Sequence, residues 1–282
     1  MMFDQAAKLR TIASRHREET TMTAQPFIIT VTSGKGGVGK STISLNLSLA
    51  IAATGKKVLL VDADSNLANL DVLLGMSPQV RLSHVLRGEK SMEEAILPVW
   101  KGMKILPGSS GDIRFPLFDT EIQLKLLEDL RSLTNPFDYI IIDTGAGLNS
   151  EVVTAALNTD ATLVVTTPEP TAVMDAYAVI KTVCLESNGE LDLKLIVNAA
   201  WSPIDAEETG RKLQMVVNHF LKVNLNYLGY IPYDKNVHQA VVEQQPVVLR
   251  FPRSASALSI QKIAQIIVRQ PRVQFNERVA VK

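Results

Sequence analysis

Two lysines and four glycines are crowded into residues 34–41, which read GKGGVGKS. The stretch fits the phosphate-binding pattern G-x-x-x-x-G-K-[ST], and it lies between an apolar run typical of a strand and a segment typical of a helix. In such a loop the glycines let the backbone N–H groups point inward, and the helix that follows adds its positive end. We expect Lys40 to contact the β and γ phosphates and the Ser41 hydroxyl to hold Mg2+.

The loop as a whole is expected to bind the nucleotide. The expected contacts are Gly34, Lys35, Gly36, Gly37, Val38, Gly39, Lys40, Ser41 and Thr42. A phosphate-binding loop needs only one lysine, so Lys35 requires a separate explanation.

Carboxylates follow two other apolar runs. Asp62 and Asp64 end the stretch KVLLVDAD, and Asp143 ends FDYIIID, which is the Walker B pattern. A carboxylate at such a point binds Mg2+ through water, and a single carboxylate aimed at a water is sufficient for phosphoryl transfer, which depends on positioning. We therefore expect Asp143 to be a metal-binding residue.

Short β-branched runs alternate with helical segments from Phe27 onward. Strands that are apolar throughout and separated by helices predict a parallel sheet covered on both faces. We read residues 25–270 as one doubly wound α/β domain, in which ligands bind at the carboxyl ends of the strands. Residues 1–24 are expected to form a short N-terminal appendage, and residues 271–282 a C-terminal tail.

The composition excludes several classes of protein. The chain has 282 residues, with 29 basic and 29 acidic side chains, so its formal net charge of zero does not favour DNA as a partner. A single cysteine, Cys184, excludes a disulfide framework and any cysteine-rich metal site built by one chain. Neither a secretory signal nor an apolar run of about 20 residues is present, so the expected location is the cytoplasm.

The motif KGGVGK[ST] resembles that of the deviant Walker A ATPases, the MinD and ParA class. The resemblance implies an ATPase that uses ATP and Mg2+ and works as an ATP-dependent homodimer, in which Lys35 reaches the phosphates bound by the partner subunit. It also implies that Asp64 orients the attacking water and that Asp62 supports the Mg2+ shell. The expected catalytic residues are therefore Lys35, Lys40 and Asp64, and the expected metal-binding residues are Ser41, Asp62 and Asp143.

Two later segments resemble those that enclose adenine in MinD-like proteins. They contribute Asn198, from LIVNAAW, and Pro232, Tyr233 and Asp234, from IPYD. An asparagine offers both a donor and an acceptor to a base edge. The family often has a basic residue after this asparagine, whereas Ala199 follows here. The stretch TTPEPTAVMDAY also resembles the family, and its Glu169 is expected near the base, near the dimer seam or simply in a loop.

Within this family the chain resembles the flagellar-number regulators of the FlhG (FleN, YlxH) group. Residues 4–10, DQAAKLR, match a motif that in this group binds the flagellar GTPase FlhF and stimulates its hydrolysis. A glutamine is a suitable water-positioning group for another GTPase. The expected partner-binding residues are Asp4, Gln5, Leu9 and Arg10.

The resemblance implies an ATP-dependent switch that regulates flagellar number or placement. A ParA-type ATPase that positions DNA or protein cargo is the alternative, and a metabolic enzyme of the same superfamily is a third class. Flagellar switch (C-ring) proteins, a flagellar transcription regulator and the inner face of the membrane or the cell pole stay open as further partners or locations. The apolar residues of the tail scatter around a helical wheel, so the tail signal for lipid binding is weak.

Overall fold

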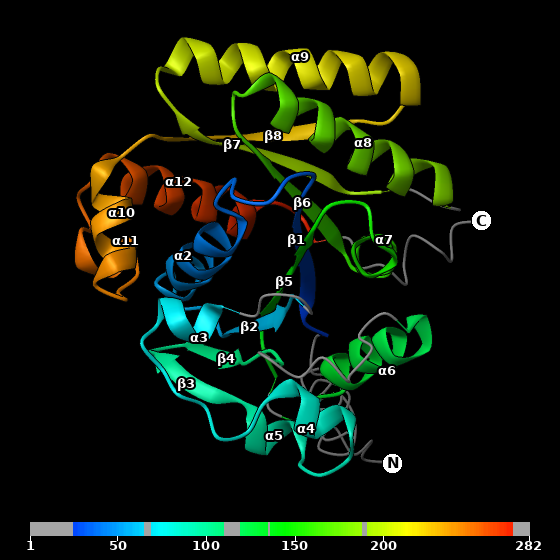
Figure 1. Cartoon of the computed structure of the whole chain (residues 1–282), viewed down its shortest axis with the longest axis vertical. Helices are drawn as coiled ribbons and strands as arrows, with labels where there is room; N and C mark the ends of the chain where they lie inside the picture. Colours follow the sequence, from blue (N-terminus) through cyan, green and yellow to red (C-terminus); the bar gives the residue numbers. More distant parts are fainter. Residues whose placement is uncertain (1–24, 65–68, 110–118, 135, 188–190, 273–282) are drawn as a thin grey trace, which may run out of the picture.

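The computed structural model describes residues 25–64, 69–109, 119–134, 136–187 and 191–272. Within them lies one eight-stranded sheet with the strand order β3-β4-β2-β5-β1-β6-β7-β8 (Figure 1). Only the β3–β4 pair is antiparallel. The strands are β1 (Phe27–Ser33), β2 (Val58–Ala63), β3 (Leu97–Trp100), β4 (Met103–Leu106), β5 (Tyr139–Ala146), β6 (Ala161–Thr166), β7 (Leu193–Ala200) and β8 (Leu225–Pro232).

Helices cover both faces of this sheet. In Figure 1, α2 and α12 lie on one side of the sheet, and α6, α7 and α8 lie on the other. The helices are α2 (Lys40–Ala52), α3 (Leu70–Leu73), α4 (Leu82–Leu86), α5 (Met92–Ala95), α6 (Thr120–Arg131), α7 (Ser150–Leu157), α8 (Pro170–Glu186), α9 (Pro203–Leu221), α10 (Lys235–Val242), α11 (Val247–Arg250) and α12 (Ala255–Arg269). The predicted doubly wound, mostly parallel α/β sheet is confirmed.

The strand sequences explain this burial. All seven residues of β1 and all six of β6 are buried, as expected of central strands covered on both faces. Alternate residues of β1 pack into different cores: Ile29 joins the cluster beneath α2 and α12, and Ile28 joins the cluster beneath α6. At the edge of the sheet, β8 is only partly buried. Burial therefore fixes the register of the central strands, and two of them, β2 and β5, carry Asp62 and Asp143 of the candidate site.

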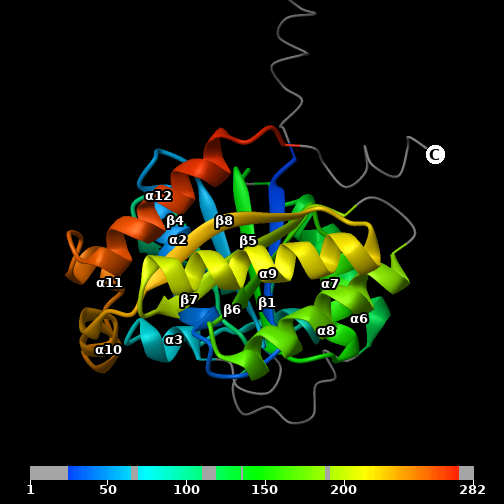
Figure 2. The same cartoon turned by 90° about the horizontal axis from the view of Figure 1, so that it is seen from above.

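The two edges of the sheet, at the beginnings and at the carboxyl ends of its parallel strands, have different neighbours. Near the beginnings, the carbonyl oxygen of Asp138 accepts hydrogen bonds from the backbone N–H of Phe27 and from the guanidinium of Arg272, at 3.1 and 3.4 Å. The beginning of β1 and the end of α12 therefore lie close together, at the top of Figure 2. The loop between β1 and α2 lies at the opposite edge, where the predicted site residues meet.

Candidate functional site

The loop between β1 and α2 has the backbone of an anion-binding turn. Gly37 and Gly39 have φ angles of +82° and +89°, in the left-handed region that favours glycine. Gly39 is the N-cap of α2 and provides no side-chain cap, so the first N–H groups of the helix are not satisfied by a capping side chain. A Cβ atom at position 39 would overlap the side-chain amide of Asn198. These features give residues 34–41 the geometry expected of a phosphate-binding loop.

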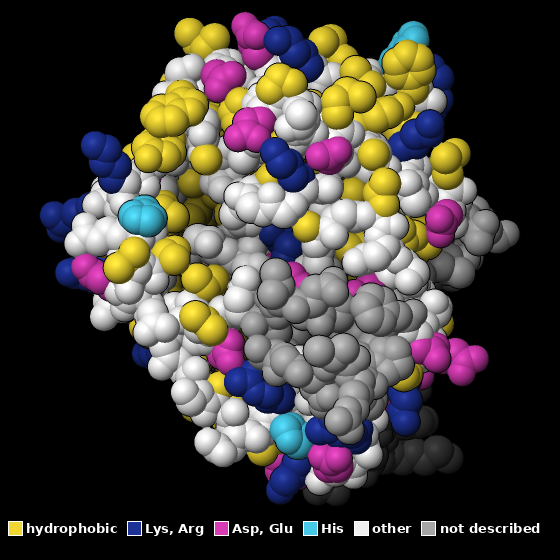
Figure 3. All heavy atoms as spheres, in the orientation of Figure 1, with side chains coloured by type: hydrophobic (Ala, Val, Ile, Leu, Met, Phe, Trp, Pro, Cys, Tyr) yellow, Lys and Arg dark blue, Asp and Glu magenta, His cyan; other side chains and the backbone are white. Residues whose placement is uncertain are grey.

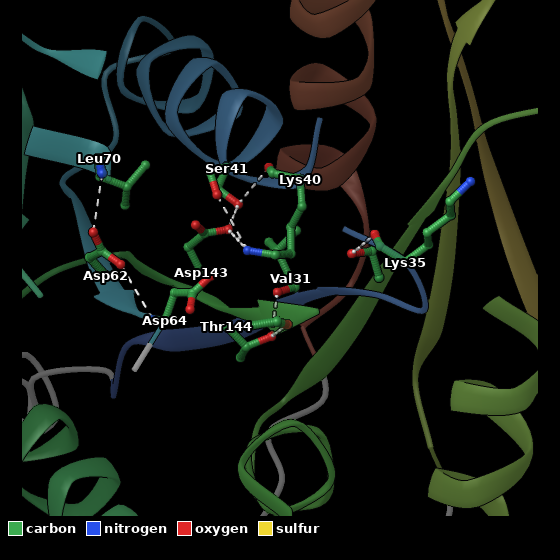
Figure 4. Close-up of polar contacts among 12 residues, drawn as sticks. Val31, Lys35, Lys40, Ser41, Asp62, Asp64, Leu70, Asp143 and Thr144 are labelled. Carbon is green, nitrogen blue, oxygen red and sulfur yellow. Dashed lines mark hydrogen bonds and ion pairs between the residues drawn. The ribbon is translucent and has the colours of Figure 1, made fainter. Parts of the chain in front are cut away.

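Lys40, the first residue of α2, is buried against the Walker B aspartate. Its Nζ atom lies 3.0 Å from Oδ1 of Asp143 and 3.4 Å from Oγ of Ser41. Ser44, one turn further along α2, donates a hydrogen bond of 2.7 Å to the same Oδ1 atom. Lys40 is 7 % exposed and Asp143 is fully buried. One buried ion pair thus joins the start of α2 to β5 (Figure 4).

A second buried carboxylate lies beside this pair. Asp62 on β2 is in register with Asp143 on β5, and it is 1 % exposed. Burial, and then the negative charge of Asp143, raise the pKa of Asp62 to about 7, against the lowering effects of backbone N–H groups and Lys40. The carboxylates of Asp62 and Asp143 are therefore balanced by the positive charge of one lysine, Lys40, and an additional cation would stabilise them.

The residues predicted to bind Mg2+ suit that ion. The Oδ2 atom of Asp143 is buried and has no hydrogen-bond partner among the residues that the structure describes. A buried carboxylate oxygen left in this way implies a missing partner, and Mg2+ takes oxygen ligands. The same described residues contain no group of three or more His, Cys, Asp or Glu side chains that would enclose a metal. Mg2+ usually uses one or two carboxylates together with phosphate oxygens and water, and Asp143 and Asp62 would provide the carboxylates.

Asp64 lies next to this cluster, at the end of β2. Its backbone N–H donates to Oδ1 of Asp62 at 3.4 Å, and its own Oδ1 lies 3.7 Å from where a Cβ of Gly145 would be. Asp64 is partly buried. It therefore faces the end of the Walker B strand β5, just before Gly147, whose backbone N–H donates a hydrogen bond of 2.8 Å to the carbonyl of Ser33.

Lys35 is not part of the Lys40–Asp143 cluster. Figure 4 shows its side chain extending away from Lys40 and Asp143. Its Nζ atom lies 3.1 Å from Oε2 of Glu169 and 3.3 Å from Oγ1 of Thr171, at the beginning of α8. Both partners of this ion pair are exposed, the lysine side chain by 43 % and the glutamate side chain by 66 %, so the pair is readily broken.

At the expected base-binding end, the predicted residues come together in part. The side-chain amide of Asn198 donates a 2.7 Å hydrogen bond to the carbonyl of Val38, which places Asn198 against the phosphate-binding loop. Pro232 and Tyr233 lie beside the end of β7, because Tyr233 donates a 2.8 Å backbone hydrogen bond to Ala200.

The carboxylate of Asp234 serves two helices instead. It accepts from the N–H of Asn236 at 2.9 Å and from Ser256 N and Oγ at 3.1 and 2.8 Å, and so joins α10 to α12. Burial acts to raise its pKa, but these hydrogen bonds and one from Ser254 outweigh burial and lower the pKa below its usual value. The Asp234 carboxylate is thus held between α10 and α12 in this structure.

Some predicted residues cannot be placed, and others were missed. Asp4, Gln5, Leu9 and Arg10 lie outside the described residues. Ser44 was not predicted, although its position one turn after Lys40 put it on the same side of α2. The contacts of Lys35 with Glu169 and Thr171 left no signal, because they join residues more than 130 positions apart. In the part of the chain that the structure describes, no helix is long and apolar enough to cross a membrane.

Comparison with known proteins agrees with this geometry. A family model described as an AAA domain matches residues 27–193. The antiactivator FleN of Pseudomonas aeruginosa is 37 % identical over 84 % of this chain and 85 % of its own. The flagellum site-determining protein YlxH of Helicobacter pylori is 35 % identical, over 85 % of this chain and 81 % of its own.

A solved structure shares the whole fold. The septum site-determining protein MinD of Pyrococcus horikoshii, complexed with Mg-ADP, superposes with a TM-score of 0.70 and 30 % sequence identity. The match covers 86 % of this chain and 96 % of that one. A protein of similar fold has thus been solved in complex with Mg-ADP.

Proposed function

The chain belongs to the MinD- and ParA-like family of ATPases, in company with FleN and YlxH, and on this premise we propose that it is an ATP-dependent dimerising switch in flagellar regulation. Its cofactors are ATP and Mg2+, as in the family. ATP hydrolysis is the reaction that the family implies. Dimer dependence, the flagellar partners and the roles of individual residues are the parts that we propose.

In this proposal residues 34–41 bind the phosphates of ATP, and Lys40 contacts the β and γ phosphates. Ser41, Asp62 and Asp143 would hold Mg2+, which when bound neutralises charge on the phosphate oxygens. Asp143 is supported for this task by its unpartnered Oδ2 atom, and Asp62 by its register position beside it. Lys40, now paired with Asp143, is within reach of phosphates once a cation takes over that carboxylate.

Asp64 is assigned to orient the attacking water. It lies one residue beyond Ala63, which ends β2, close to Gly145 in the Walker B strand, and is less buried than Asp62. Positioning of a nucleophile is the main contribution that a side chain makes to phosphoryl transfer. The loop after β5 lies against the same point and would move with the γ-phosphate.

Dimerisation is carried by one observation, the direction of Lys35. This side chain points away from Lys40 and Asp143 of its own chain and contacts two exposed partners, Glu169 and Thr171. An exposed cation beside a nucleotide site is suited to reach phosphates held by a second copy, where it would stabilise charge in the transition state as an arginine finger does.

Sedimentation of the full chain with Mg2+ and either ATP or ADP tests the switch. We expect dimers with ATP and monomers with ADP, because only the γ-phosphate distinguishes the two states. Asp64→Ala should still bind ATP and should accumulate dimers, with turnover lowered at least about 100-fold. A protein that hydrolysed ATP at a normal rate as a monomer, or kept its turnover after Asp64→Ala, would contradict the proposal.

The flagellar role is supported by FleN and YlxH, whose names describe an antiactivator and a flagellum site-determining protein. We assign the segment with Asp4, Gln5, Leu9 and Arg10 to the flagellar GTPase FlhF, with Gln5 as the group that positions water in that partner.

A comparison of two neighbouring substitutions tests this assignment. Gln5→Ala should abolish stimulation of GTP hydrolysis by FlhF, whereas Lys8→Ala, at the second variable position of the motif D-Q-A-x-x-L-R, should not. Stimulation that survives Gln5→Ala, or is lost equally in both variants, would remove the assignment. ATP hydrolysis by this chain should be the same in both.

A further inference from the structure

Trp201 is an exposed tryptophan between β7 and α9. It is 77 % exposed, and its indole stacks on the ring of Tyr233, with 4.2 Å between the ring centroids and 23° between the ring planes. Tyr233 is itself 48 % exposed. A large aromatic pair left in water marks a surface where something binds. Tyr233 covers one face of the indole, so the other face is left for a ligand.

The two rings stand on a fixed backbone. Trp201 precedes Ser202, which caps α9 by accepting a hydrogen bond of 3.1 Å from the N–H of Asp205. Tyr233 precedes Asp234, which caps α10, and its own N–H donates to the carbonyl of Ala200. A rigid aromatic side chain loses little conformational entropy when it binds a ligand, so this pair is preorganised for contact.

A bulge connects the aromatic pair to the phosphate-binding loop. Val197 pairs with Tyr230, and Ala200 pairs with Pro232, so β7 has one more residue than β8 between these points. Ala199 within the bulge has a φ angle of +52°, which is costly for a residue with a side chain. The bulge aims Asn198 at Val38 and brings the chain to Trp201 three residues later.

The surface near the beginnings of α9 and α10 is hydrophobic and borders a hollow (Figure 3). In the orientation of Figure 3, hydrophobic side chains gather over the beginning of α9 and toward α10, beside a hollow in the surface. Trp201 and Tyr233 lie two residues before α9 and α10 in the chain, and Ile204, the second residue of α9, is 73 % exposed.

We propose that the free face of Trp201, backed by Tyr233, stacks on the purine base of the nucleotide whose phosphates lie at residues 34–41. The polar groups nearby leave this task to the rings: the carboxylate of Asp234 is used between α10 and α12, and Ala199 offers no polar side chain. Asn198, whose Nδ2 atom donates to Val38, would offer its Oδ1 atom to the base, and Trp201 would add stacking to the affinity that the phosphate contacts provide. This inference rests on the nucleotide binding proposed above.

Binding measurements on the full chain test the inference without ATP hydrolysis. The ligands are Mg-ADP and inorganic tripolyphosphate with Mg2+, titrated by calorimetry into the wild type, Trp201→Ala and Trp201→Phe. Trp201→Ala should weaken ADP binding by about 5-fold to 100-fold, which is the range for stacking of one base on an aromatic ring. Trp201→Phe should retain most of the affinity, and tripolyphosphate should bind all three proteins equally.

Fluorescence offers a second readout because the chain has two tryptophans. In Trp100→Phe the only indole is Trp201, and ADP should change its emission, whereas tripolyphosphate should not. The matched control is Trp201→Phe, in which Trp100, on β3 at the opposite edge of the sheet, should not respond.

Three results would overturn the inference. They are unchanged ADP affinity in Trp201→Ala, an equal loss for ADP and tripolyphosphate, and an emission change that requires ATP and rises with protein concentration, which would place Trp201 between two copies. Failure of the wild type to bind ADP would overturn the proposed function as well. A wild type that binds ADP but never dimerises with ATP would overturn the switch and leave Trp201 in place.

Discussion

Asp62 and Asp143 lie opposite each other on adjacent strands and are both buried, and Lys40 forms an ion pair of 3.0 Å with Asp143. Two buried carboxylates that are both ionised destabilise the folded protein, because they repel each other and have lost their hydration. A bound cation would offset this cost. The sequence predicted this meeting of residues, because carboxylates after parallel strands converge at one edge of the sheet. The hydrogen bond of Ser44 to Asp143 was not predictable, since it depends on how α2 is rotated against β5.

The raised pKa of Asp62 gives the nucleotide-free protein a distinct pH dependence. With a pKa of about 7 in the folded protein and 3.8 as the ordinary value, the folded state binds the extra proton between these values. Its contribution to stability is therefore complete below about pH 4 and is lost as the pH rises toward 7. Thermal unfolding from pH 5 to 8 should show the wild type losing stability relative to Asp62→Asn.

Addition of Mg-ADP provides the control for that experiment. Mg2+ favours ionised carboxylates, so the difference between the wild type and Asp62→Asn at pH 7 should shrink or reverse. Parallel melting curves of the two proteins across the whole pH range, with and without Mg-ADP, would show that Asp62 does not titrate as described.

At the scale of elements, long apolar strands were predictable and short or irregular ones were not. Runs such as FIITVT predict a buried strand, because residues on both faces of the strand are largely apolar. The four-residue strand β3 carries Pro98 and pairs antiparallel at the sheet edge, and α3, α4 and α5 have five residues or fewer, too few to show a period. The bulge at Ala199 was not predictable, because the residue with the positive φ angle is an alanine and not a glycine.

The hydrogen bonds by which Asp234 joins α10 to α12 lead to a stability prediction. Asp234→Ala removes an N-cap and also the bonds to Ser256, so the free energy of unfolding should fall by about 2–3 kcal/mol. Asp119→Ala is the matched control, since Asp119 caps α6 by accepting a hydrogen bond of 2.9 Å from the N–H of Glu121, and its removal should cost about 1 kcal/mol. Urea unfolding of both variants measures the difference, and equal losses would show that the bonds to Ser256 add nothing.

For the whole molecule, the sheet topology explains why one lysine of the loop faces inward and the other outward. β1 lies between β5 and β6, so Lys40 at the start of α2 meets Asp143, and the loop before it passes the beginning of α8. Lys35 therefore lies on the side of Glu169, outside the cluster of its own chain. The alternation of strands and helices predicted this fold. The same pattern could not predict whether Lys35 contacts the nucleotide of its own chain or that of a second copy.

In the proposed switch, Lys35 acts on the nucleotide of a second copy, while Asp64 acts on the nucleotide of its own chain. Lys35→Ala and Asp64→Ala should each be inactive in ATP hydrolysis and should still bind ATP. Mixed in equal amounts, they should recover about one quarter of the wild-type rate, because half of the dimers would be mixed and each would have one complete site. A mixture as inactive as its components, or a Lys35→Ala monomer with normal turnover, would contradict the account.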